Sequence, residues 1–219
     1  MFTYLFPGLL LLSISSCRQR HITPVNKTFA AAKTDLSAYK KAAFAAGCFW
    51  HEELLFESVK GVKEAVSGYA GGTTKDPTYE EVSTGNTGHA ESVMVYYDST
   101  QITYPQLLKV YFEAQDDPTQ VNGQGPDYGT EYRSIIFYSN AQEKALADEY
   151  IGSMNRSGKY KQPVAAQVIP YDTFWKAEDY HQDYIDRNPD NSYVQDVSIP
   201  DVRRFQKKCP EMIKPGKKL

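Results

Sequence analysis

The chain has 219 residues, which is room for one domain with a substantial core rather than two. Hydrophobic residues make up 41% and charged residues 23% of the chain, as in ordinary soluble globular proteins. The net charge of −3 provides no basic stripe of the kind that binds nucleic acid. We therefore expect one folded domain without a nucleic-acid partner.

The N-terminal residues have the composition of a secretory signal. Residues 5–14 are almost wholly apolar, but the run is shorter than the roughly 20 residues that a membrane span needs. It continues into Ile14-Ser15-Ser16-Cys17, which resembles the lipobox of bacterial lipoproteins, whose cysteine becomes the lipid-modified first residue. The first four residues lack the positive charge that usually precedes such a run. We predict a signal peptide at 1–16 and lipidation at Cys17; an uncleaved anchor is the alternative.

Either arrangement places the rest of the chain in the bacterial cell envelope, facing the periplasm. Residues 17–38 are polar and show no sustained period, so they predict a tether between the lipid and the domain. We predict the folded domain over residues 39–193 and a C-terminal tail over 194–219.

Within the domain, the spacing of apolar residues changes between strand-like and helix-like periods. Short apolar or alternating runs predict strands at 42–46, 62–69, 91–97, 132–138 and 164–170. Helical spacing predicts helices at 49–59, 104–114, 141–154 and 176–187. Long segments rich in glycine and proline, typical of functional loops, occupy 74–90 and 115–131. Strands and helices do not alternate regularly, which favours an α+β fold over a doubly wound sheet.

Cys48 follows Gly47 between a predicted strand and a predicted helix. Free cysteines are often small buried hydrophobes, and that reading fits the composition. The position favours a nucleophile, because the field at a helix N-terminus lowers the pKa of a thiol. We therefore expect the pKa of Cys48 to be lowered.

The residues around Cys48 resemble a known family. Residues 47–53, Gly-Cys-Phe-Trp-His-Glu-Glu, are similar to the signature Gly-Cys-Phe-Trp-x-x-Glu of A-type peptide methionine sulfoxide reductases. Further blocks stand in the order that the family has them, at 68–72, 77–79, 87–91, 117–120, 124–134 and 177–182. The resemblance spans about residues 40–190 and implies an α+β two-layer sandwich with a ferredoxin-like core.

The resemblance also assigns chemical roles. It makes Cys48 the nucleophile that attacks the sulfoxide sulfur, and Glu91 the protonated acid that donates to the sulfoxide oxygen. The hydroxyls of Tyr79 and Tyr132 help to bind that oxygen. This division is physically reasonable, because a sulfoxide oxygen leaves only when it is protonated, and burial can keep a carboxyl group neutral.

Three further residues take supporting roles by the same resemblance. Phe49 and Trp50 form an apolar pocket for the terminal methyl group, and Asp127 positions the substrate or a bound water. Glu53 also matches the signature, and we expect it to have a structural role. The implied activity is reduction of the S epimer of methionine sulfoxide in oxidised proteins, with no bound cofactor, by a monomer.

Attack leaves Cys48 as a sulfenic acid, which condenses readily with a second thiol. Many relatives carry a resolving cysteine soon after the Asn-Pro pair that ends the domain, and this chain has none there. Cys209 is therefore the candidate resolving cysteine; it either resolves Cys48 or fills an apolar site. We predict that a Cys48–Cys209 disulfide forms on turnover, because the chain offers no other thiol once Cys17 is lipidated. A thioredoxin-like protein or a small thiol is the expected external reductant.

Two other functions compete with this interpretation. A thiol hydrolase or acyltransferase would use Cys48 with His89 or His181 as its base. A tyrosine-rich binding lipoprotein would bury an inert Cys48. The histidines, including His51, lack the spacing of a zinc site, and we expect no metal.

Overall fold

The structure is a computed structural model that describes Met1 and residues 35–219. The predicted signal peptide, Cys17 and most of the predicted tether lie outside these residues. Residues Asp35–Leu219 form one compact unit. In this described part of the chain, no helix is long and apolar enough to cross a membrane.

A six-stranded sheet with the order β7-β6-β1-β3-β2-β8 forms the centre of this unit. All neighbouring strands are antiparallel except the parallel pair β6–β7. The strands are β1 (Lys40–Ala45), β2 (Val62–Ala70), β3 (Ala90–Tyr97), β6 (Ile135–Tyr138), β7 (Gln167–Pro170) and β8 (Phe174–Lys176). The long helices are α1 (Phe49–Glu57), α3 (Tyr104–Ala114), α4 (Ala141–Arg156) and α6 (Ile199–Lys208).

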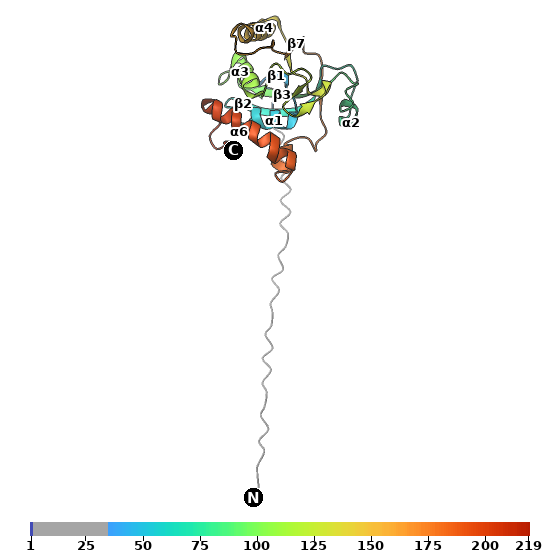
Figure 1. The fold of residues 1–219 in the computed structure, drawn as a ribbon, viewed down its shortest axis with the longest axis vertical. Coiled ribbons are helices and arrows are strands. Elements are labelled where there is room, and N and C mark those ends of the chain that lie inside the picture. Colours follow the sequence, from blue (N-terminus) through green and yellow to red (C-terminus); the bar gives the residue numbers. More distant parts are fainter. Residues whose placement is uncertain (2–34) are drawn as a thin grey trace. The chain divides into compact units, whose positions relative to one another are not determined.

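The predicted fold class is confirmed. The elements β1-α1-β2-β3-α3-β6 follow one another as in a ferredoxin-like βαββαβ unit, and their strands lie in the order β6-β1-β3-β2. Figure 1 shows this sheet with its helices. On the face that carries α1 and α3, the Phe44 ring stacks on Phe56 from α1 and on Tyr111 from α3, each at 5.3 Å between centroids.

The segment predicted as a C-terminal tail is folded into the same unit. It contains the π-helical turn η2 (Val194–Ser198), α6 and the 3₁₀ turn η3 (Pro210–Met212). α6 contacts both α1 and α3, and Figure 1 shows it beside α1. Val202 and Phe205 on its inner face are fully buried. The folded unit therefore extends beyond residue 193.

The helix predicted at 176–187 is wrong. Lys176 ends β8, and only α5 (Tyr184–Arg187) is helical. The interruption occurs at Asp183, whose φ of 52° is left-handed and whose backbone N–H donates to Glu53 Oε2 at 3.0 Å. A contact with a distant helix therefore overrides the local helical spacing.

Short elements complete the two long loops. They are α2 (Tyr79–Val82), the hairpin of β4 (Gly123–Gln124) and β5 (Asp127–Tyr128), and the 3₁₀ turn η1 (Thr130–Tyr132). The strand predicted at 132–138 begins only at Ile135, because Tyr132 belongs to η1. These elements place loop residues against the N-terminus of α1.

Candidate active site

Cys48 is the N-cap residue of α1 and is buried, with 5% of its surface exposed. The turn before it depends on Gly47, whose φ of 85° favours glycine. A Cβ at this position would lie 2.8 Å from Gln124 Cβ, so no larger residue fits. The Gly47 N–H donates to the Tyr132 carbonyl at 3.2 Å, which fixes η1 beside the thiol. The predicted position of Cys48 at a helix N-terminus is therefore what the structure shows.

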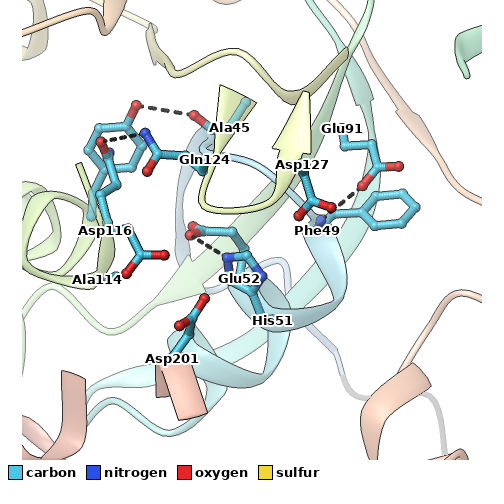
Figure 2. Close-up of polar contacts among 12 residues, drawn as sticks. Ala45, Phe49, His51, Glu52, Glu91, Ala114, Asp116, Gln124, Asp127 and Asp201 are labelled. Atoms are coloured by element: carbon cyan, nitrogen blue, oxygen red, sulfur yellow. Dashed lines mark hydrogen bonds and ion pairs between the residues drawn. The ribbon is translucent and has the colours of Figure 1, made fainter. Parts of the chain in front are cut away.

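Glu91 faces the same helix end from β3. It is 3% exposed, and its Oε2 accepts the backbone N–H of Phe49 at 3.0 Å (Figure 2). Burial raises the pKa of Glu91 to about 8, although this hydrogen bond favours the charged form and opposes the shift. The carboxyl group is thus largely protonated at neutral pH, as the resemblance implies for the proton donor.

The thiol pKa differs from the expectation. Burial raises the pKa of Cys48 well above its ordinary value, and the negative charges of Glu91 and Asp127 act in the same direction. A hydrogen bond from the Trp50 backbone N–H favours the thiolate but does not compensate. The helix N-terminus is therefore outweighed by burial and by two neighbouring carboxyl groups. Protonation of Glu91 removes one of these charges.

Two tyrosine hydroxyls share this environment. Tyr79 is the first residue of α2 and Tyr132 the last of η1. Burial is the main cause that raises the pKa of Tyr79 to about 12, and the charges of Glu91 and, more weakly, Cys48 add to it. The same influences raise the pKa of Tyr132, with Tyr79 and Asp127 also contributing. Both phenols therefore keep their protons at neutral pH and can donate hydrogen bonds.

Asp127 reaches the site from β5 of the short hairpin and is half-buried. Burial raises its pKa. Its Oδ2 accepts a hydrogen bond of 2.6 Å from the hydroxyl of Tyr193, which precedes η2. Figure 2 shows Asp127 and Glu91 near the backbone of Phe49. The sequence analysis missed Tyr193.

Aromatic rings form an apolar wall at the N-terminus of α1. The Trp50 ring stacks on Tyr184 with 3.7 Å between centroids and an angle of 6°. Its Nε1–H donates to His181 Nδ1 at 3.0 Å, and the His181 ring also lies 4.9 Å from Phe49. This packing fixes the rings of Phe49 and Trp50 beside Cys48, and their role as a methyl pocket stays a prediction.

Glu53 has the structural role that the sequence analysis gave it. Its carboxyl group accepts the backbone N–H groups of Ser67 at 3.4 Å and Asp183 at 3.0 Å. It thereby ties α1 to β2 and to the turn that carries His181 and Tyr184.

A second polar cluster lies on the other side of α1. His51 is buried and faces Glu52, with 3.6 Å between Nε2 and Oε1, and Asp116 and Asp201 lie around the pair (Figure 2). Burial opposes the charge of His51, but Glu52, Asp201 and Asp127 together raise its pKa. Asp116 forms an ion pair with Arg204 of α6.

The structure does not bring Cys209 to Cys48. Both are free thiols, and Cys209 ends α6, where Lys109 and Glu113 of α3 are its charged neighbours. The residues that follow it pair beyond the C-terminal end of α1, through a β-bridge from Ile213 to Val59. Cys48 lies at the opposite end of this helix.

The histidines required by a thiol hydrolase are engaged elsewhere. His181 Nδ1 accepts from Trp50, and His89 interacts through Nε2 with the Thr74 carbonyl at 2.7 Å and accepts from Gly72 N–H through Nδ1 at 3.1 Å. No group of three or more potential metal-ligating side chains occurs among residues 35–219. The assembled groups are a thiol, a neutral carboxyl and phenol donors, which suit reduction of a polarised S–O bond.

Two residues of the site, His181 and Tyr193, could not be assigned their contacts from the sequence. His181 lies in a block that resembles the family, but the sequence gives it no role in sulfoxide reduction, because its partner Trp50 is distant in the chain. Tyr193 lies in no recognised block, so nothing local indicates that it meets Asp127.

Comparisons with known proteins agree with this site. The profile of the family described as peptide methionine sulfoxide reductase matches residues 40–213. Peptide methionine sulfoxide reductase MsrA 2 of Synechocystis sp. is 45% identical over 175 residues, covering 80% of this chain and 82% of that protein. Peptide methionine sulfoxide reductase MsrA of Pasteurella multocida is also 45% identical, covering 80% of this chain and 99% of its own.

Solved structures show the same likeness. Methionine sulfoxide reductase A of Corynebacterium diphtheriae has a TM-score of 0.61 and 35% identity, over 68% of this chain and 75% of that one. Reduced Mxr1 from Saccharomyces cerevisiae has a TM-score of 0.65 and 32% identity, over 73% and 91% of the two chains. With a matching profile, a matching fold and the predicted nucleophile at the N-terminus of α1, the chain belongs to the peptide methionine sulfoxide reductase family.

Proposed function

We propose that the protein reduces the S epimer of methionine sulfoxide, free and in oxidised proteins, through attack of Cys48 on the sulfoxide sulfur. The main support is the pairing of a buried thiol with Glu91, whose raised pKa keeps a proton available at neutral pH. Tyr79 and Tyr132 donate hydrogen bonds to the sulfoxide oxygen, and the wall of Phe49 and Trp50 accepts the methyl group.

In this reaction the Cys48 thiolate forms a bond to sulfur while Glu91 transfers its proton to the sulfoxide oxygen. In the adduct that results, the OH group passes from the substrate sulfur to the Cys48 sulfur. The S–O bond of the substrate and the new bond between the two sulfurs break, methionine leaves, and Cys48 is oxidised to a sulfenic acid. The first thiol of an external reductant then releases water and forms a mixed disulfide with Cys48. A second thiol displaces Cys48 as a free thiol and completes the reductant's own disulfide.

Turnover of separated S and R sulfoxides with dithiothreitol tests this function. We expect reduction of the S epimer, and complete loss of it in Cys48→Ser. Cys209→Ser is the matched control and should keep the wild-type rate. Turnover by Cys48→Ser, or equal turnover of both epimers, contradicts the proposal.

We also propose that the external thiol reduces Cys48 directly, without a Cys48–Cys209 disulfide, because Cys209 lies at the other end of α1. One turnover without reductant, followed by alkylation and peptide mass analysis, should find Cys209 still alkylated in full. A Cys48–Cys209 disulfide in that sample would show that the chain rearranges to resolve itself.

We further propose that the protein is exported and lipid-anchored through Cys17, in the bacterial envelope. The support is the apolar run and the Ile14-Ser15-Ser16-Cys17 motif. The full-length protein should partition into detergent when expressed in a bacterium with lipoprotein export, and Cys17→Ser should move it to the aqueous phase. An unmodified Cys17 thiol in membrane-isolated protein contradicts this.

A further inference from the structure

Tyr193 is held at the site by contacts on both its ring and its hydroxyl. The hydroxyl donates to Asp127 Oδ2 at 2.6 Å. The ring meets Trp50 edge-on, with 6.1 Å between centroids and an angle of 76°. The next residue, Val194, is fully buried, and its N–H donates to Asn191 Oδ1 at 3.2 Å. The tyrosine is therefore positioned by the folded C-terminal segment.

The Tyr193 hydroxyl also reaches the nucleophile. Burial raises the pKa of Cys48, and Glu91 and Asp127 add to the shift, whereas a hydrogen bond with the Tyr193 side chain opposes it. Burial, then the charge of Cys48 and the interactions with Asp127, raises the pKa of Tyr193. The Tyr193 hydroxyl thus interacts with both the Cys48 thiol and the Asp127 carboxyl group, and its raised pKa keeps it protonated.

The reaction needs an acceptor for the Cys48 proton. Glu91 does not serve, because it must remain protonated to donate to the sulfoxide oxygen. His181 accepts from Trp50 and is occupied. Asp127 can accept a proton when its carboxyl group is ionised. The Tyr193 hydroxyl links it to the thiol, because this hydroxyl hydrogen-bonds to Asp127 and interacts with Cys48.

We propose that Tyr193 is a catalytic residue that relays the thiol proton of Cys48 to Asp127. The Tyr193 O–H bond breaks toward Asp127 as the oxygen takes the proton from sulfur, so that the phenol is unchanged and the pair becomes a thiolate and a neutral carboxyl group. The thiolate then attacks the sulfoxide while Glu91 gives up its own proton. Exchange with solvent returns the proton from Asp127 to Glu91. The inference rests on the proposed function.

The first test is Tyr193→Phe in the full chain, which keeps the ring against Trp50 and removes the hydroxyl. Methionine formed from the S epimer in one turnover without reductant should appear about 100-fold more slowly at neutral pH. Alkylation of the Cys48 peptide by iodoacetamide should fall roughly tenfold at pH 7, with its pH profile moved upward. Tyr150→Phe, on α4 and stacked on Phe112, is the matched control and should change neither rate.

Asp127→Asn removes the proton acceptor but keeps a hydrogen-bonding oxygen. Because the relay needs both groups, the double variant with Tyr193→Phe should be no slower than the slower single variant. The relay would be overturned if the double variant lost rate by the product of the two single losses. It would also be overturned if Tyr193→Phe kept the wild-type pH profile of alkylation. If the unaltered protein reduces no sulfoxide at all, the proposed function fails, whereas the alkylation profile still reports on Tyr193.

Discussion

Glu91 keeps its proton near neutral pH because its carboxyl group is buried between β3 and the N-terminus of α1. The acid form is the one that reacts, and its pKa is about 8. The single-turnover rate should therefore lose tenfold for each pH unit above about 8, as the carboxyl group loses its proton. Single-turnover rates measured at a series of pH values and at fixed ionic strength test this decline, which is the alkaline limb of the pH profile.

Glu91→Gln should reduce the rate at pH 7 by roughly 10²- to 10⁴-fold and remove the alkaline limb, because an amide donates no proton. The exposed Glu149→Gln on α4 is the control and should retain both the rate and the limb. A Gln variant with the wild-type limb would assign that limb to another group.

Residue roles could be predicted only where the sequence resembles a known pattern or where burial can be inferred. The resemblance placed Cys48, Glu91, Tyr79, Tyr132 and Asp127 together, and the structure brings all five to one site. It could not supply the direction of the Cys48 pKa shift, because that shift depends on burial and on carboxyl groups far away in the chain. The Tyr193–Asp127 contact spans two segments with no shared motif.

At the scale of elements, α6 stabilises the helix that carries the nucleophile. Phe205 is fully buried where α6 packs against α1 and α3. Phe205→Ala should lower the free energy of unfolding by about 3–5 kcal/mol, because it leaves a cavity in this contact. Urea denaturation measures the change; Arg203→Ala, on the exposed face of the same helix, should stay within about 0.5 kcal/mol. Equal stability of the two variants would mean that α6 is only loosely attached.

Some missed elements had readable signals. Thr78 and Glu81 form a capping box that begins α2, and the pattern Thr-x-x-Glu is visible in the sequence. In α6, Pro200 stands in the first turn and Val202 and Phe205 have helical spacing. No such signal in the sequence shows that the helix predicted at 176–187 is interrupted, because the interruption comes from the long-range contact between Asp183 and Glu53.

At the scale of the whole molecule, two buried carboxyl groups link stability to pH. Burial raises the pKa of both Glu53 and Glu91 to about 8, from 4.5. Between these values the folded state binds more protons than the unfolded state, so the free energy of unfolding falls as pH rises. Each group contributes a slope of roughly 1.4 kcal/mol per pH unit in that window.

Urea denaturation from pH 4 to 9 should show this decline for the unaltered protein and a shallower decline for Glu53→Gln. The exposed Glu149→Gln is again the control and should keep the wild-type slope. A stability that rises through this window would mean that Glu53 is charged in the folded protein.

The order in which the site is built along the chain matters during biosynthesis. Cys48 and Glu91 lie on early elements, whereas Tyr193 and α6 are made last. A ribosome-bound chain that has released β1 to β3 carries the sulfur but lacks Tyr193 beside it and the helix that packs against α1. A domain generally folds as a unit, so the site is complete only after this C-terminal segment has been synthesised. The nucleophile therefore stands on the chain before the residues that complete its site have been made.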